Sequence, residues 1–152
     1  MSEIKFRRAQ ETDLPAIIAM LADDPLGRNR EHARAPIAES YRDAFAAVDA
    51  DPNQILAVMT EDGRVIGTLQ ISFLVGLSRQ GAMRGQIEAV RVAADRQRAG
   101  LGQRLLAWAI DECRLRGCKV VQLTTDKSRL DAHRFYDRLG FKASHIGYKL
   151  EL

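Results

Sequence analysis

The segment from Val90 to Arg104 has the residue types and spacing that most clearly predict a chemical role. It reads Val-Arg-Val-Ala-Ala-Asp-Arg-Gln-Arg-Ala-Gly-Leu-Gly-Gln-Arg, so two glycines separate a β-branched run from an amphipathic helical pattern. The first turn of a helix leaves N–H groups without internal partners and carries partial positive charge. Glycine lets a ligand approach the backbone because it has no Cβ. The pattern predicts a phosphate or diphosphate site, with Arg96, Arg98 and Arg104 adding positive charge around it.

Two better-known phosphate motifs do not fit this segment. A dinucleotide-binding turn needs a third glycine where Leu105 stands, and no Gly-Lys-Ser/Thr of a P-loop is present. A plain strand-to-helix turn, with glycines chosen only for geometry, is the remaining alternative.

Glu88 is the candidate general base. Strand alternation through Gln86–Val92 predicts that Glu88 shares a face with Gln86 and Val90, while Ile87, Ala89 and Arg91 take the other. A carboxylate in a central strand is costly unless it is paired or used. It could act as a general base and remove a proton from a substrate, directly or through water. The alternative is an ion pair with Arg91 or Arg84.

Two spaced motifs resemble the GCN5-related N-acetyltransferase (GNAT) family. The first is Gln97-Arg98-Ala99-Gly100-Leu101-Gly102, preceded by the strand Val90-Arg91-Val92. The second is the later helix with Ala132, Tyr136, Gly140 and Phe141. The order of predicted elements along the whole chain also fits, although the N-terminal third matches only in its elements.

The resemblance implies acetyl-CoA as donor co-substrate and no metal. The diphosphate would lie on the amides of residues 98 to 103, and the pantetheine arm along the Val90–Val92 strand. Glu88 would act as base and Tyr136 as acid, although Tyr136 among Phe135, Leu139 and Phe141 also reads as a core aromatic. The cofactor-binding residues so implied are Val90, Arg91, Val92, Gln97, Arg98, Ala99, Gly100, Leu101, Gly102, Gln103 and Arg129. Arg129 departs from the family, which often has Asn there, and arginine cannot accept a hydrogen bond.

The elements that must position these residues follow from periodicity and turn signals. Helices are expected from Leu14 through Leu21 and over Pro36–Val48, Gly100–Arg116 and Asp131–Leu139, the second burying Ile37, Tyr41, Ala44, Phe45 and Val48. Strands are expected over Ile4–Arg8, Gln54–Thr60, Arg64–Val75, Gln86–Val92, Lys119–Thr125 and Ile146–Leu150, with Asp62-Gly63 as a hairpin turn.

This order predicts a mixed α+β or α/β fold with helices on both faces of the sheet. The resemblance implies a mostly antiparallel sheet of six to seven strands. A length of 152 residues without linker or repeat predicts a single domain over 1–152.

Composition excludes several classes of protein. The formal net charge of +3 is mild and its signs are interleaved, which does not indicate nucleic-acid binding. The sequence has no signal-peptide core and no apolar run of membrane-spanning length, so we expect a cytoplasmic protein that does not bind membranes. Cys113 and Cys118 read as buried free thiols. The three histidines, His32, His133 and His145, lack metal-ligand spacing.

The favoured function is acetyl transfer from acetyl-CoA to a primary amine of a small molecule. The alternatives are transfer to a protein or peptide amine (a lysine side chain or an N-terminus), and a non-catalytic acyl-CoA-binding module. Asp23, Asp24 and Glu31, in the polar loop Asp23–Arg34, could attract a cationic amine, or the loop could simply be solvated. Exposed strand edges make a homodimer reasonable in this family.

Overall fold

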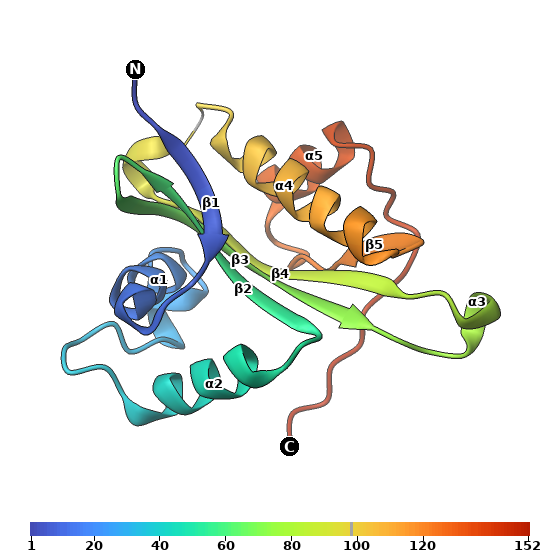
Figure 1. Cartoon of the computed structure of the whole chain (residues 1–152), viewed down its shortest axis with the longest axis horizontal. Helices are drawn as coiled ribbons and strands as arrows, with labels where there is room; N and C mark the ends of the chain where they lie inside the picture. The colour runs from blue at the N-terminus through green and yellow to red at the C-terminus, as the bar shows by residue number, and fades with distance from the viewer. Residues whose placement is uncertain (98) are drawn as a thin grey trace. The chain divides into compact units, whose positions relative to one another are not determined.

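The computed structural model describes residues 1–97 and 99–152, and its centre is one β-sheet (Figure 1). The five strands lie in the order β1-β2-β3-β4-β5, and the pairs β1–β2, β2–β3 and β3–β4 are antiparallel. Their bounds are β1 Ile4–Arg8, β2 Gln54–Glu61, β3 Arg64–Leu74, β4 Arg84–Val92 and β5 Val120–Leu123. The main helices are α1 Leu14–Ala22, α2 Glu39–Ala50, α4 Leu101–Arg116 and α5 Leu130–Arg138, and α3 is the short turn Ser78–Gly81.

The β2–β3 hairpin confirms the turn expected at Asp62-Gly63. Both residues have positive φ, 48° and 86°, as the tight hairpin turn with the twist of its strands requires. The Asp62 carboxylate also accepts the Glu3 backbone N–H at 2.8 Å, which ties the start of the chain to this turn.

One face of the sheet is covered by α4. Leu105, Leu106 and Ala109 of this helix are fully buried. The helix approaches β4 so closely that a Cβ added to Gly85 would lie 2.4 Å from the Cys113 Sγ. Midway along the helix, the Trp108 ring stacks on Phe6 of β1 with centroids 5.9 Å apart. This tight packing fixes where α4 begins relative to β4.

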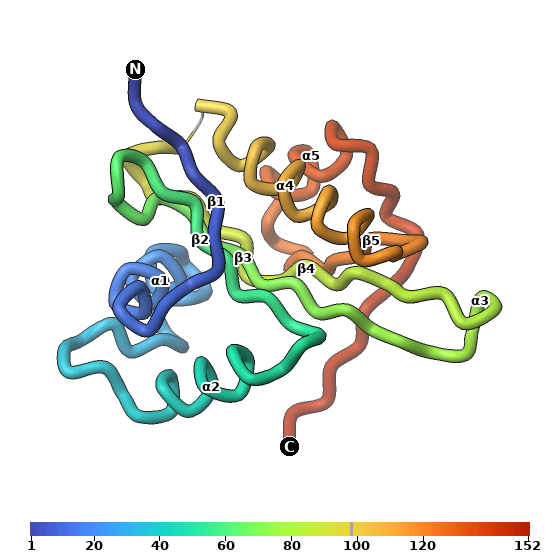
Figure 2. The backbone as a smooth tube through the Cα atoms, viewed as in Figure 1, coloured from blue at the N-terminus to red at the C-terminus, as the bar shows by residue number. Residues whose placement is uncertain are grey.

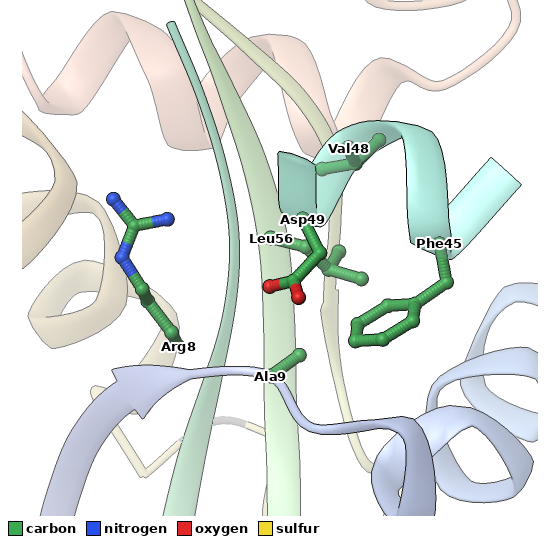
Figure 3. Close-up of a pocket in the computed structure, with 6 residues that line it drawn as sticks. All are labelled: Arg8, Ala9, Phe45, Val48, Asp49 and Leu56. Carbon is green, nitrogen blue, oxygen red and sulfur yellow. The ribbon is translucent and has the colours of Figure 1, made fainter. Parts of the chain in front are cut away.

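The opposite face carries a smaller apolar cluster beneath α1 and α2. Ala9, Ile17 of α1 and Val58 of β2 are buried there, with Phe45 of α2 packed against them. A pocket of about 10 Å³ lies between α2, β2 and the end of β1 (Figure 3). It is smaller than the roughly 300–1,000 Å³ of typical ligand pockets, so it is a packing gap rather than a substrate site.

Three sequence predictions about the elements are corrected. The described residues form five strands, not six to seven, because residues 146–150 make no strand within the chain. The second helix begins at Glu39 rather than Pro36. It buries no residue fully, and Ala44 is exposed, because only one edge of α2 faces the sheet. Other elements, including the helix predicted over Gly100–Arg116, are confirmed to within a few residues.

The chain divides into two compact units, residues 1–122 and 123–152. The second unit contains α5 and the segment after it. No helix among the described residues is long and apolar enough to cross a membrane. Cys113 is buried and Cys118 half-buried, and both thiols are free.

Candidate active site

A β-bulge interrupts β4 at Ala89 and Val90. Glu88 pairs with Gln70 of β3 and Arg91 pairs with Thr68, so two residues of β4 lie opposite the single residue Leu69. Ala89 has a φ of 53°, a left-handed conformation that costs an alanine roughly 1–2 kcal/mol. Such a bulge bends the strand and changes where the following side chains point.

The bulge overturns the expected alternation of side chains along β4. Residues directly opposite in an antiparallel pair share a face, and Thr68 and Gln70 lie two apart on β3. Arg91 is therefore on the same face as Glu88, not on the face of Ile87. Strict period two fails here because the extra residue shifts the pattern by one.

Glu88 itself is exposed, on the face of the sheet that α1 and α2 cover. Among the described residues, its carboxylate makes no ion pair or hydrogen bond, so the suggested pairing with Arg91 or Arg84 is wrong. Arg91 instead pairs with Asp24, and Arg84 donates to the Gln122 side chain at 3.5 Å. A solvent-accessible carboxylate without a cationic partner is available to exchange protons.

A band of amide side chains flanks Glu88 on the same face. The Gln70 amide donates to the Gln54 Oε1 at 2.7 Å, and the Gln122 amide donates to the Gln86 Oε1 at 2.7 Å. Sequence reasoning missed this band, because its members come from four different strands. A signal was present for two of them, since Gln70 and Gln122 each stand between apolar residues of a strand.

Arg91 ties β4 to the loop after α1. Its guanidinium lies 2.9 Å from the Asp24 Oδ2, and the two side chains are only 14% and 15% exposed. Arg91 also donates to the carbonyl of Val90 in the bulge at 2.9 Å. The other Asp24 oxygen accepts the Gly27 N–H at 2.5 Å. Asp24 is thus already neutralised by Arg91, which leaves it a poor attractor for a cationic amine.

The start of α4 presents a bare set of backbone amides. Arg104 N–H is the first to bond within the helix, to the Gly100 carbonyl at 3.2 Å, and no side chain among the described residues caps the earlier amides. Gly100 has a φ of 73°, and a Cβ built there would meet nothing within 4 Å. The exposed positions Ala99 and Gln103 and the half-buried Gly102 flank this opening. Open space over unpaired amides fits an anionic group such as a diphosphate.

Arg96, near this opening, is held by ion pairs. Arg96 is held by Glu61 at 2.6 Å and approaches Asp95, which in turn pairs with Arg64, so the expectation that Arg96 supplies mobile charge is wrong. The hydrogen bond from Arg96 lowers the pKa of Glu61, and the one from Arg64 lowers the pKa of Asp95.

Three further residues lie in or next to the turn before α4: Gln97, Arg98 and Arg104. Arg104 is exposed, and Arg98 lies outside the described residues. The Gln97 amide donates to the Val92 carbonyl at 3.2 Å, which braces the turn against the end of β4.

Several hydrogen bonds join the start of β4 to the residues in and just before β5, and all of these lie before the bulge. Lys119 N–H donates to the Met83 carbonyl at 2.9 Å, and the Gln122 side chain meets those of Arg84 and Gln86. Val90 lies in the bulge itself, and Val92 comes after it.

The second unit contains the other predicted site residues. Tyr136 of α5 is half-buried, and its ring makes edge-on contacts with Phe135 and Phe141 at 5.2 and 5.8 Å between centroids. Arg129 is exposed at the N-cap of α5. The His133 ring interacts with the Asp126 carbonyl at 2.8 Å. No cluster of metal-ligating side chains exists among the described residues.

Comparison with known proteins gives a consistent result. The model of the acetyltransferase (GNAT) family matches residues 15–141. The aminoalkylphosphonate N-acetyltransferase of Salmonella typhimurium is 31% identical over 97% of this chain and 91% of its own length. The glucosamine 6-phosphate N-acetyltransferase of Trypanosoma brucei brucei is 32% identical over 59% of each chain.

A solved structure agrees with these relatives in fold. A protein of Bacillus halodurans described as a transcriptional regulator is 44% identical, covers 99% of this chain and 100% of its own, and superposes with a TM-score of 0.96. The matched family, the near full-length relative and the geometry at the start of α4 agree, and the chain belongs to the acetyltransferase (GNAT) family.

Proposed function

We propose that the protein transfers the acetyl group of acetyl-CoA to a primary amine of a small molecule. The observation that carries this proposal is the uncapped start of α4, where Gly100 leaves open space above unpaired amides directly after β4. Enzymes of the GNAT family use acetyl-CoA as the donor.

The donor would be held by backbone more than by side chains. The amides of residues 98 to 103 are proposed to bind the diphosphate, and the backbone of Val90 to Val92 the amide chain of pantetheine. An extended amide chain needs an unpaired strand edge, and β4 after its bulge is where we expect one. Gln97 supports this site by holding the turn to Val92. Arg129 would contribute only as a hydrogen-bond donor.

Acetyl-CoA supplies an activated carbonyl carbon, and the chain must supply proton transfers. The amine nitrogen forms its bond to that carbon as the C–S bond breaks. Glu88 accepts the proton that the amine gives up, directly or through a water molecule. Its exposure and its lack of a cationic partner among the described residues support this role. Tyr136 would give a proton to the departing sulfur, a role that rests on its match to the family motif.

The proposed class of acceptor rests on the relatives and on the glutamine side chains that flank Glu88. Both curated relatives are named for small amines that carry a phosphorus oxyanion. In this chain the glutamine band offers neutral donors and acceptors beside the carboxylate. Such a surface would orient a polar amine without fixing it by charge.

An amine panel tests the proposal. Thiol release from acetyl-CoA is followed with aminoalkylphosphonates, amino-sugar phosphates, amino sugars and lysine peptides as acceptors. We expect turnover with one or more small amines, and a loss of about 10²–10⁴ in kcat for Glu88→Gln, the usual contribution of a general base. Tyr136→Phe should slow the same reaction by at least about tenfold.

Glu39→Gln is the matched control, because Glu39 is exposed at the start of α2 and should leave the rate unchanged. Turnover restricted to lysine peptides would move the acceptor to proteins. Binding of CoA with no turnover on any amine would indicate a binding module. A Glu88→Gln enzyme of full activity would remove the assigned base.

A further inference from the structure

An ion pair joins the β2–β3 hairpin to the turn before α4. Glu61 is the last residue of β2, and Arg96 ends the short helix η3, Ala94–Arg96, 35 residues later. The Arg96 Nε donates to the Glu61 Oε2 at 2.6 Å, and Figure 2 shows the hairpin beside this turn. The Glu61 side chain is only 17% exposed, so water screens this pair less than a fully exposed one. The pair can therefore hold the two segments together more firmly than an ion pair in open solvent.

The two neighbouring charges, Arg64 and Asp95, make a weaker second link between the same segments. Arg64 follows the hairpin turn and donates to both Asp95 oxygens, but each of these two side chains is more than half exposed. Exposed pairs contribute little, because water screens their charges. Arg96 also approaches Asp95, at 3.4 Å. The bond between Glu61 and Arg96 is thus the stronger of the two connections.

Few backbone contacts hold the turn after Arg96. Ala93 N–H donates to the Ile66 carbonyl of β3, and Arg96 N–H donates to the Ala93 carbonyl, both at 2.8 Å. Among the described residues, no backbone N–H from 97 to 103 donates to another backbone carbonyl. The Gln97 side chain adds one bond to the end of β4. Side chains at the beginning of the turn therefore have a large share in fixing the path that leads into α4.

We infer that Glu61 is a positioning residue for the acetyl donor. Glu61 fixes the guanidinium of Arg96, and Arg96 fixes the turn whose end carries the proposed diphosphate amides. A turn held in one place presents these amides already aligned, so less conformational entropy is lost when the anion binds. Glu61 lies on the hairpin and has no part in the proposed acyl transfer. The inference rests on the proposed function, because it needs a diphosphate at the start of α4.

Calorimetric titration with acetyl-CoA tests this role. Glu61→Gln should weaken the affinity for acetyl-CoA about tenfold, the scale of one hydrogen bond to a charged group. The kcat at saturating donor should stay within about twofold, because the pair acts on donor binding and not on the chemical step.

Glu3→Gln is the matched control for this titration. The Glu3 carboxylate pairs with Lys5 in open solvent, next to the residue of β1 that lies opposite Glu61, so the affinity for acetyl-CoA should not change. An affinity of Glu61→Gln equal to that of the unaltered protein, or a tighter one, would overturn the role of Glu61.

A donor without the diphosphate separates positioning from a general loss of structure. S-acetylpantetheine carries the same thioester but ends before the diphosphate. Glu61→Gln should lower kcat/KM about tenfold with acetyl-CoA and should leave kcat/KM with S-acetylpantetheine within about twofold. An equal loss with both donors would show a structural effect alone, and the positioning role would be wrong.

A double-variant cycle shows whether Glu61 acts through Arg96. In an Arg96→Met background, Glu61→Gln should change the affinity for acetyl-CoA by less than about twofold, because its partner is already absent. Additive losses would contradict this coupling. Failure of the proposed function gives a different result. If the unaltered protein neither binds acetyl-CoA nor releases thiol from it, the function and the role of Glu61 both fall, whereas normal turnover with an unaffected Glu61→Gln variant removes the role of Glu61 alone.

Discussion

Arg91 joins three parts of the chain through one guanidinium group. It pairs with Asp24 in the loop after α1, bonds the Val90 carbonyl in the bulge, and stands on β4 three residues from Glu88. The pair is largely removed from water, so each charge depends on the other. Arg91 therefore couples the loop beside the proposed acceptor surface to the strand that carries the proposed base.

Removing either charge alone should be more damaging than removing both. Asp24→Asn or Arg91→Met removes one charge of a largely buried ion pair, which costs about 3–5 kcal/mol of unfolding free energy. Because the two side chains interact directly, the loss in the double variant should fall below the sum of the two single losses by roughly 1–3 kcal/mol. Urea unfolding of the four proteins measures this coupling.

The exposed pair of Arg64 and Asp95 is the matched control for this cycle. Arg64 donates two hydrogen bonds to Asp95, at 2.8 and 3.0 Å, but both side chains are more than half exposed. Arg64→Met and Asp95→Asn should therefore add without measurable coupling. Additive effects at Asp24 and Arg91 would show that their ion pair does not carry the expected energy.

At the scale of elements, α4 is bounded by two glycines in the same backbone conformation. Gly100 has a φ of 73° and Gly117 a φ of 88°, and a Cβ at either would meet nothing within 4 Å. Alanine at each position should cost about 1–2 kcal/mol of stability, because both would adopt the left-handed region. Of these two glycines, only Gly100 lies at the proposed diphosphate site.

Gly100→Ala should weaken acetyl-CoA binding about tenfold, because its methyl group would project into the space proposed for the diphosphate. Gly117→Ala carries the same backbone strain at the far end of the helix and should bind acetyl-CoA as the unaltered protein does. Isothermal titration calorimetry measures both affinities. Equal affinities in the two variants would contradict a diphosphate site at the start of α4.

The sequence predicts an element well where the residue that sets its conformation is of a type that favours that conformation. The hairpin turn and the ends of α4 were predicted because Asp-Gly, Gly100 and Gly117 adopt conformations that few other residues tolerate. The β4 bulge was not predicted. Ala89 carries no such mark, and strict alternation was assumed although the apolar positions change phase between Ala89 and Val90. The strand at residues 146–150 was predicted from a local alternation of apolar residues, but a strand also needs a hydrogen-bonded neighbour, and these residues form no strand in the structure.

At the scale of the whole molecule, Asp13 links the first strand to the first helix. Its carboxylate accepts two bonds from the Arg7 guanidinium, at 2.7 and 3.0 Å, and one from the Gln10 N–H at 2.7 Å. The hydrogen bonds from Arg7 hold the pKa of Asp13 below its usual range, despite burial of the carboxylate. Folding therefore favours the ionised form.

Stability should depend on pH through this carboxylate. Because the pKa is lower in the folded than in the unfolded protein, the contribution of Asp13 is complete above the unfolded value near 3.9 and is lost as the pH falls through the folded value. Asp13→Asn should cost roughly 2 kcal/mol at pH 7, and the difference should shrink below about pH 4. Chemical unfolding from pH 7 to pH 3 measures it. Asp43→Asn, exposed on α2, is the control, and a constant difference for Asp13 would contradict this linkage.

The light packing of α2 has a consequence for how this protein can diversify. None of its twelve residues is fully buried, and it rests on the sheet through a few half-buried side chains such as Phe45 and Val48. Mutations along this helix should therefore pass selection for folding more easily than mutations in α4. Over generations, the surface formed by α2 can change while the start of α4, which packs on the opposite face of the sheet, stays constant. The fold thus separates a helix that tolerates substitution from one that does not.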